Sequence, residues 1–278
     1  MARRAGTATT PRTDQAGPPF PDAAVTHRRS PSLSDIQTNY RKGLLLTAIG
    51  GLALTVDIPL IRLSDGDAWS ILLLRTGTTF VAALVIWAVW RMITPQAPQL
   101  LPGRAGVVVA ALYGLGSITF VTGVYHTSTA NLVFILAFNT MFAAVLSWIF
   151  LKERPSKATL MTMAVMILGI LIIVGDSVGT GNLFGDFMAL CSAFLIAAAI
   201  TVSRASGKDM GFTALIGVIF PFLVALAMVG DAGFRVESPW WIIFNGAVIM
   251  PISFFCLAAG PKYISGAEVA MFYLLGTV

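Results

Sequence analysis

The stretch LLLTAIGGLALTVDIPLIRL, residues 44–63, is almost entirely apolar and decides the fold class of this chain. A run of about 20 apolar residues crosses the hydrocarbon core of a bilayer as an α-helix. Such runs recur along the 278 residues, which are 56% hydrophobic and 11% charged, with a mean hydropathy of +0.83. Because a soluble domain is about one quarter charged, we predict an all-α, polytopic membrane helix bundle.

Eight full spans and part of a ninth are expected. They lie at roughly 43–61, 68–91, 104–124, 129–150, 157–175, 182–203, 212–230 and 239–260, with the ninth starting near 264. Residues 1–42 are instead rich in Pro, Ser and Thr and carry seven basic residues. No apolar stretch follows the first arginines, so a disordered cytoplasmic tail is predicted rather than a cleaved signal peptide.

The basic residues predict the orientation in the membrane. Fifteen of them lie in the tail and in the connections on its side, whereas only Arg62 and Arg235 lie in the opposite connections. Cytoplasmic loops are enriched in Lys and Arg. We therefore expect the N-terminus and residues 152–157 on the cytoplasmic side of a bacterial inner membrane, and residues 62–67 and 231–238 on the outer side. The same rule explains the net charge of +5, so no nucleic-acid partner is expected.

Two segments of the chain match at a constant spacing. GVYHTSTANLVFILAFNTM starts at residue 123 and GPKYISGAEVAMFYLLGTV starts at residue 260, and a Gly, a Ser, an Ala and a Thr coincide at an offset of 137. The match pairs the turn before span four with the turn before span nine, so the repeating unit is five spans and the second copy is inverted. Inverted repeats are typical of secondary transporters. We predict a first repeat at 43–175 and an incomplete second repeat at 182–278, ending inside helix nine of a ten-helix plan.

The stretch TSTANLVFILAFNTMFAAVLSWIFLKERPSKATLMTMAVMILGILIIVGD, residues 127–176, resembles the EamA domain of the drug/metabolite transporter superfamily. The matching features are an apolar span ending near a Leu-x-Glu, a short basic turn, and a span that carries Gly169 and ends at Gly175. LFGDFMALCSAF at 183–194 looks like the start of the second repeat. The resemblance covers about 43–278 and implies ten helices in two inverted repeats that move small organic solutes, often outward.

The chain departs from the family pattern in three places. Thr140 and Thr277 stand where the family commonly has Pro, Lys152 stands where it commonly has Gly, and helix ten is absent. A buried Thr can still bend a helix by bonding its own backbone.

Two charged residues lie inside expected spans, where charge is costly and usually faces the bundle interior. Asp57 and Arg75 fall on consecutive antiparallel spans, at depths that differ by roughly 3 Å for a 1.5 Å rise per residue. The sequence therefore predicts a pair, with a role in substrate or proton binding. The resemblance supports Arg75, because an arginine is often seen early in the family's second helix. The alternative is that Arg75 reaches the outer headgroups and Asp57 only balances its charge.

Three prolines are candidates for helix kinks, because proline lacks an N–H and frees the carbonyl of residue i−4. Pro221 and Pro251 fall mid-span, where a freed carbonyl needs a partner and a bent helix suits a cavity; packing kinks are the alternative. Pro59 would make a polar notch beside Asp57, or would merely fall in the last turn of its span.

Further polar residues give weaker candidates. Glu268 and Asp186 could take a proton or could be favoured at helix starts by the dipole. Thr119, Thr122 and His126 fall on one face of span three and could line a solute path, although a lone His near a membrane surface is often interfacial. Interhelical hydrogen bonds are expected from Asn131, Asn139 and Asn245, and Glu153 is expected to pair with its basic neighbours.

No motif indicates catalysis. GTGNLFG at 179–185 is a near miss for a dinucleotide fingerprint without a preceding strand, and P-loop, HExxH and GxSxG motifs are absent from the sequence. Cys191 and Cys256 lie in apolar runs and are expected as buried small hydrophobes. We therefore expect no catalytic, cofactor-binding or metal-binding residues, and no enzyme.

The sequence favours a secondary transporter of small organic solutes that works by alternating access. Outward transport and proton coupling through Asp57 or Glu268 are expected. The partners would be the solute and membrane lipid, with a homodimer left open. Two alternatives are a non-transporting or vestigial membrane protein and, less favoured, a membrane-embedded enzyme.

Overall fold

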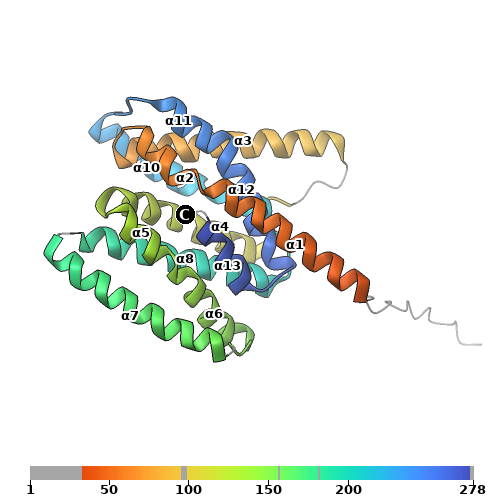
Figure 1. Cartoon of the computed structure of the whole chain (residues 1–278). Helices are drawn as coiled ribbons and strands as arrows, with labels where there is room; N and C mark the ends of the chain where they lie inside the picture. Colours follow the sequence, from red (N-terminus) through yellow and green to blue (C-terminus); the bar gives the residue numbers. More distant parts are fainter. Residues whose placement is uncertain (1–32, 95–98, 156, 181, 276–278) are drawn as a thin grey trace, which may run out of the picture.

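The computed structural model describes residues 33–94, 99–155, 157–180 and 182–275, and this part of the chain is a helix bundle (Figure 1). The helices of its first half are α1 (Leu33–Leu54), α2 (Asp57–Leu63), α3 (Ala68–Ile93), α4 (Gly103–His126), α5 (Thr129–Leu136), α6 (Phe138–Leu151) and α7 (Lys157–Thr180). The second half has α8 (Leu183–Ser206), α9 (Gly211–Gly217), α10 (Ile219–Ala232), α11 (Pro239–Phe244), the π-helix η1 (Asn245–Ile249), α12 (Met250–Ala259), the 3₁₀-helix η2 (Gly260–Lys262) and α13 (Gly266–Leu275).

Seven helical segments of the described residues are long and apolar enough to cross a membrane. They are Gln37–Leu63, Ala68–Ile93, Gly103–His126, Thr129–Leu151, Leu183–Ser206, Gly211–Gly230 and Pro239–Lys262. Each corresponds to one of the eight full spans expected from the sequence. The remaining expected span, at 157–175, lies in α7. Among the described residues of α7, the apolar stretch is the shorter segment Leu160–Gly169. The chain is thus a multi-pass integral membrane protein with an all-α fold.

The start of the first span differs from the prediction. Residues 33–42 were assigned to the disordered tail by composition, yet α1 begins at Leu33. A tertiary contact explains part of this extension, because the Tyr40 hydroxyl donates a hydrogen bond to Glu268 Oε1 of α13 at 2.8 Å. Residues 1–32 lie outside the described part of the chain.

The connections gather at two ends of the bundle. At one end the segments 64–67 and 233–238 lie side by side: Gly66 and Val236 form an isolated antiparallel bridge, and the Glu237 N–H donates to the Asp65 carbonyl at 2.8 Å. At the other end Lys208 Nζ donates to the Pro102 carbonyl at 3.3 Å, and Lys262 pairs with Asp209 at 3.7 Å. This grouping agrees with the alternation of connections that the spans require.

The core forms where the two halves of the chain pack together. α4 runs along α8, and α1 contacts α12 and α13. In Figure 1, α13 lies near the centre beside α1, whereas α7 lies at the lower edge of the bundle. Met161 and Ile172 of α7 are each 74% exposed, as expected for a helix that faces lipid.

The offset of 137 residues relates two turns with the same contacts. Ser128 Oγ accepts from the Asn131 N–H at 3.1 Å at the start of α5, and Ser265 Oγ accepts from the Glu268 N–H at 3.2 Å at the start of α13. Both serines therefore cap a helix in the same way.

An arginine binds each of these turns at the carbonyl just before its serine. Arg62 Nη2 donates to the Val124 carbonyl at 2.5 Å and to the Thr127 carbonyl at 3.4 Å. Arg204 Nη1 donates to the Ile264 carbonyl at 2.5 Å, and Ile264 is the residue that the offset of 137 pairs with Thr127. The two turns lie at opposite ends of the bundle, as inverted copies would.

Two departures from the family pattern have a local explanation. Lys152 ends α6 with a left-handed backbone, φ 58° and ψ 21°, which is the conformation that favours Gly at a helix end. The Thr140 hydroxyl donates to the Ala137 carbonyl at 2.9 Å, at the residue that separates α5 from α6. The threonine thus sits at a helix interruption without a proline. Thr277 lies outside the described residues.

Cysteine labelling tests the orientation. Glu237 and Arg154 are exposed at opposite ends of the bundle, and we introduce Glu237→Cys or Arg154→Cys after replacing Cys191 and Cys256 by alanine. Because the positive charges are expected inside, an impermeant maleimide applied to intact cells should label position 237 and not position 154. Labelling of position 154 alone would show that the protein has the opposite orientation in the membrane.

Candidate functional site

The helices of the bundle are interrupted close to its centre. α1 stops at Leu54 and α2 starts at Asp57, Val218 separates α9 from α10, and η1 separates α11 from α12. Each interruption lies within one turn of Pro59, Pro221 or Pro251. A proline leaves the carbonyl four residues earlier without its helical partner, which accounts for a break in each of these spans.

Asp57 and Arg75 form a buried ion pair at the first interruption. Arg75 Nη2 lies 2.9 Å from Asp57 Oδ2, and Arg75 Nε lies 3.3 Å from Asp57 Oδ1. The side chains are only 4% and 5% exposed. The pair expected from the spacing of the two residues therefore forms, and burial of Arg75 excludes the alternative in which it reaches the headgroups.

Further hydrogen bonds surround this pair. Asn245 Nδ2 donates to Asp57 Oδ1 at 2.7 Å, which makes one of the interhelical asparagine bonds expected from the sequence. Arg75 Nη1 donates to Ser117 Oγ at 3.2 Å, and Nη2 contacts Met250 Sδ at 3.0 Å. The guanidinium also lies 5.5 Å from the centre of the Phe120 ring, within range of a cation–π contact.

The π-helix η1 positions two of these partners. Asn245 is its first residue, and Met250 follows its last residue and donates its N–H to the Asn245 carbonyl. The wider turn comes immediately before Pro251, whose missing N–H breaks the normal ladder. π-bulges inside α-helices are frequent at functional sites, and this one brings Asn245 and Met250 to the ion pair.

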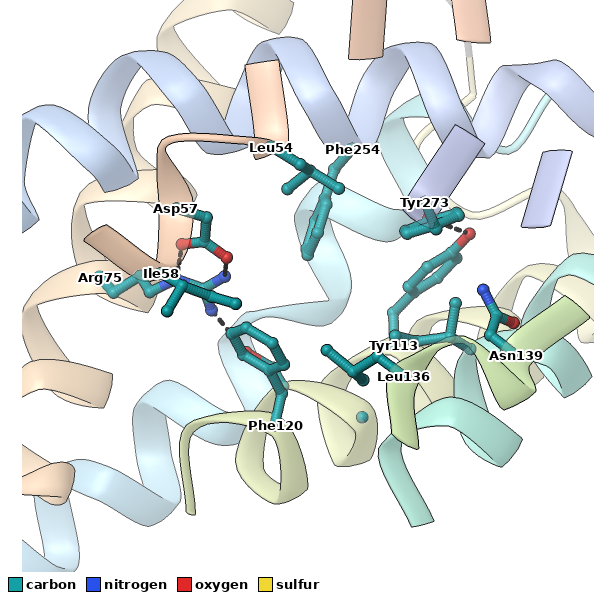
Figure 2. Close-up of a pocket in the computed structure, with 13 residues that line it drawn as sticks. Leu54, Asp57, Ile58, Arg75, Tyr113, Phe120, Leu136, Asn139, Phe254 and Tyr273 are labelled. Carbon is teal, nitrogen blue, oxygen red and sulfur yellow. Dashed lines mark hydrogen bonds and ion pairs between the residues drawn. The ribbon is translucent and has the colours of Figure 1, made fainter. Parts of the chain in front are cut away.

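A pocket opens beside the ion pair (Figure 2). Its walls are Leu54, Asp57, Ile58, Arg75, Tyr113, Gly116, Ser117, Phe120, Leu136, Asn139, Ile196, Phe254 and Tyr273. The cavity has a volume of about 70 Å³. One water molecule needs about 10–15 Å³ on the same measure. Figure 2 shows Asp57 and Arg75 on one side, Tyr113, Tyr273 and Asn139 on the other, and apolar side chains between them.

The second polar side of the pocket carries no charge. The hydroxyls of Tyr273 and Tyr113 lie 3.1 Å apart and share a hydrogen bond. Asn139 is 3% exposed, and its amide oxygen has no hydrogen-bond partner among the described residues. Asn139 thus does not make the interhelical bond expected from the sequence, and its amide is available to a molecule in the pocket.

The predicted polar stripe on α4 does not line the pocket. The Thr119 and Thr122 hydroxyls donate to carbonyls of their own helix, Gly116 at 3.1 Å and Ile118 at 2.8 Å. His126 Nδ1 lies 2.8 Å from the Thr122 carbonyl, and its ring packs against Phe184. The α4 face that lines the pocket is instead Tyr113, Gly116, Ser117 and Phe120.

The other carboxylates lie away from the pocket. Glu268 accepts from the Ser265 N–H at 2.8 Å and from Tyr40, at the start of α13. Asp186 is 4% exposed and accepts a hydrogen bond from the Thr127 hydroxyl, which ties α8 to the turn before α5. Glu153 pairs with Arg204 at 2.6 Å rather than with its basic neighbours in the sequence.

The sequence prediction missed most of the lining residues, among them Tyr113, Ser117, Phe120 and Tyr273. The first three fall at i, i+4 and i+7 of α4, together with Gly116, so aromatic and small residues alternate along one helical face. That spacing was the available signal. Tyr273 belongs to a helix whose place in the bundle only the tertiary structure reveals.

Metal binding finds no support in the described residues, where no group of three or more His, Cys, Asp or Glu side chains could hold an ion. The chemistry on offer is a neutralised ion pair, neutral hydrogen-bonding groups and apolar walls. These features suit reversible binding of a small molecule.

Comparison with known proteins agrees with this reading of the fold. The model of the EamA-like transporter family matches residues 41–175, whereas the first repeat was expected at 43–175. No curated protein matches the chain. Residues 41–175 are therefore a domain of the EamA-like transporter family, consistent with a member of the drug/metabolite transporter superfamily.

Proposed function

We propose that the protein is a secondary transporter that carries small organic solutes outward by alternating access of two inverted repeats. The pocket supports this proposal best, because its walls come from both halves of the chain: α1–α6 from one, and α8, α12 and α13 from the other. Sites at the interface of two repeats, built beside broken helices, are typical of secondary transporters. The outward direction rests on the behaviour common in the family.

The helix interruptions would serve as hinges. Each one divides a span into two segments that can tilt separately, so one end of the pocket can close while the other opens. The turns bound by Arg62 and Arg204 lie at opposite ends. Their equivalent contacts support a movement in which one end repeats the rearrangement of the other.

We assign proton coupling to Glu268 rather than to Asp57. A proton on Asp57 would break its pair and leave Arg75 as an uncompensated buried charge, which is costly. Glu268 is half-buried at one end of the bundle and bonds the exposed Tyr40, so water can reach its carboxylate. It lies in the first turn of α13, the helix that carries Tyr273 into the pocket.

Transport in proteoliposomes tests the proposal. The full chain is reconstituted and offered a panel of radiolabelled amino acids, nucleosides, aromatic amides and quaternary amines. At least one solute should enter faster than into protein-free liposomes. Ile196→Trp should abolish this uptake because the larger ring fills the pocket, whereas Met161→Ala on the exposed face of α7 should leave it unchanged.

Two outcomes would contradict transport through this pocket. One is that no member of the panel enters above the protein-free rate; the other is that the Ile196→Trp variant carries solute as fast as the original chain.

The same vesicles test the coupling. With a pH gradient, Glu268→Gln should lose uphill accumulation of the transported solute while keeping downhill exchange, because exchange needs only the moving pocket. Asp57→Asn combined with Arg75→Gln should keep gradient-driven accumulation. Retained accumulation in Glu268→Gln would remove this residue from the coupling.

A further inference from the structure

Resting on the proposed function, we infer that the pocket selects uncharged, largely apolar solutes that carry a carboxamide-type edge. Such an edge has a hydrogen-bond donor beside an acceptor. The inference follows from which polar groups of the pocket are already bonded and which are not.

The charged groups of the pocket have little capacity left for a ligand. Arg75 uses four of its five N–H groups: two on Asp57, one on Ser117 and one on Met250. Asp57 accepts from Arg75 at both oxygens and from Asn245 at one. A charged or zwitterionic solute would have to break this pair, and otherwise its own charge would be buried without a partner, which is strongly unfavourable.

The unused hydrogen-bonding capacity lies at the neutral side of the pocket. One tyrosine hydroxyl donates to the other, so the Tyr113–Tyr273 pair keeps one O–H for which the described residues provide no acceptor. The Asn139 amide oxygen has no hydrogen-bond donor among the described residues. An amide can present its oxygen or its NH₂ group, so Asn139 and the tyrosine pair together match the donor and acceptor of a carboxamide.

The rest of the pocket fits an apolar body. Leu54, Phe254, Phe120 and Leu136 lie between the two polar sides (Figure 2). Aromatic rings prefer offset or edge-to-face contact with other rings, and Phe120 and Phe254 offer such walls. A flat ring carrying a carboxamide therefore satisfies each part of the site without disturbing the ion pair.

Direct binding to the full chain in detergent micelles tests this inference independently of transport. The probes are benzamide, benzoate, benzylammonium and toluene, which share one ring and differ in charge and hydrogen bonding. Equilibrium dialysis should give benzamide an affinity at least tenfold higher than any of the other three. Asn139→Leu should lower benzamide affinity at least tenfold and leave toluene binding within twofold, because only the amide contact is lost.

Variants separate a specific contact from a folding defect. Tyr113→Phe should also weaken benzamide binding. It replaces Asn139→Leu as the test variant if Asn139→Leu does not fold. Thr122→Val, on α4 but outside the pocket, should bind like the original chain. Benzoate or benzylammonium binding as tightly as benzamide, or unchanged benzamide binding in both pocket variants, would overturn the inference.

The outcome also distinguishes this inference from the proposed function. Selective benzamide binding without transport of any solute would support the inferred selectivity of the pocket and contradict the proposed transport function. Transport of charged solutes through the same pocket would retain the transporter and reject the selectivity.

Discussion

Arg75→Ala is expected to destabilise the protein by about 3–5 kcal/mol, the range seen when one partner of a buried ion pair is removed. The substitution removes the cation from Asp57, a residue that is only 4% exposed in the protein. It also removes the bonds that tie α3 to Ser117 of α4 and to Met250 of α12. SDS-induced unfolding in mixed micelles, followed by circular dichroism, would measure the loss.

The double variant Asp57→Asn with Arg75→Gln is expected to lose much less. It removes both charges together, so it leaves no uncompensated buried charge, which is the main cost of the single substitution. Arg154→Ala provides the control for loss of an arginine, because Arg154 is exposed in the connection after α6. If the single and double variants unfold at the same SDS fraction, the two residues do not act as partners.

The Asp57–Arg75 pair was predictable because few variables determine it. Consecutive spans joined by a short connection must lie antiparallel and close together, and the rise per residue then fixes the depth of each side chain. The cost of burying a charge in a membrane supplies the rest, because each charge needs a partner at its own depth. Spacing and charge alone were therefore enough for this part of the site.

The lining face of α4 was not predictable in the same way. Thr119 and Thr122 suggested a polar path, but a threonine hydroxyl in a membrane helix can satisfy itself on a carbonyl of its own helix, as both do here. A polar residue in a span is thus no sign of a cavity unless its bond to the helix backbone is excluded. Which face of α4 turns inward depends on its packing along α8, a contact between distant parts of the sequence.

The prolines predicted where the helices are interrupted but not which backbone conformation each interruption adopts. Pro251 predicts a lost hydrogen bond near Ala247, and the backbone there forms a π-helix over Asn245–Ile249. That choice depends on Asn245 bonding Asp57 and on Gly246 fitting against α3. Both contacts join residues more than 160 positions apart, so no local pattern encodes them.

Gly246→Ala is expected to disturb the site through this contact. A methyl group at position 246 would lie on the Thr78 hydroxyl and 2.5 Å from the Arg75 carbonyl oxygen. The Thr78 side chain could rotate away, but the carbonyl belongs to the α3 backbone and cannot. Overpacking of this kind costs about 1–3 kcal/mol, and here η1 must also move away from α3.

This movement would carry Asn245 away from Asp57 and Met250 away from Arg75, so Gly246→Ala should weaken solute binding as well as stability. Gly169→Ala is the matched control: it lies in α7, and a methyl group there would meet nothing within 4 Å. The control should be neutral or should stabilise by up to about 1 kcal/mol, since Ala favours a helix over Gly. SDS unfolding and benzamide dialysis on both variants would decide the matter: equal behaviour of the two would show that the π-helix does not need its close approach to α3.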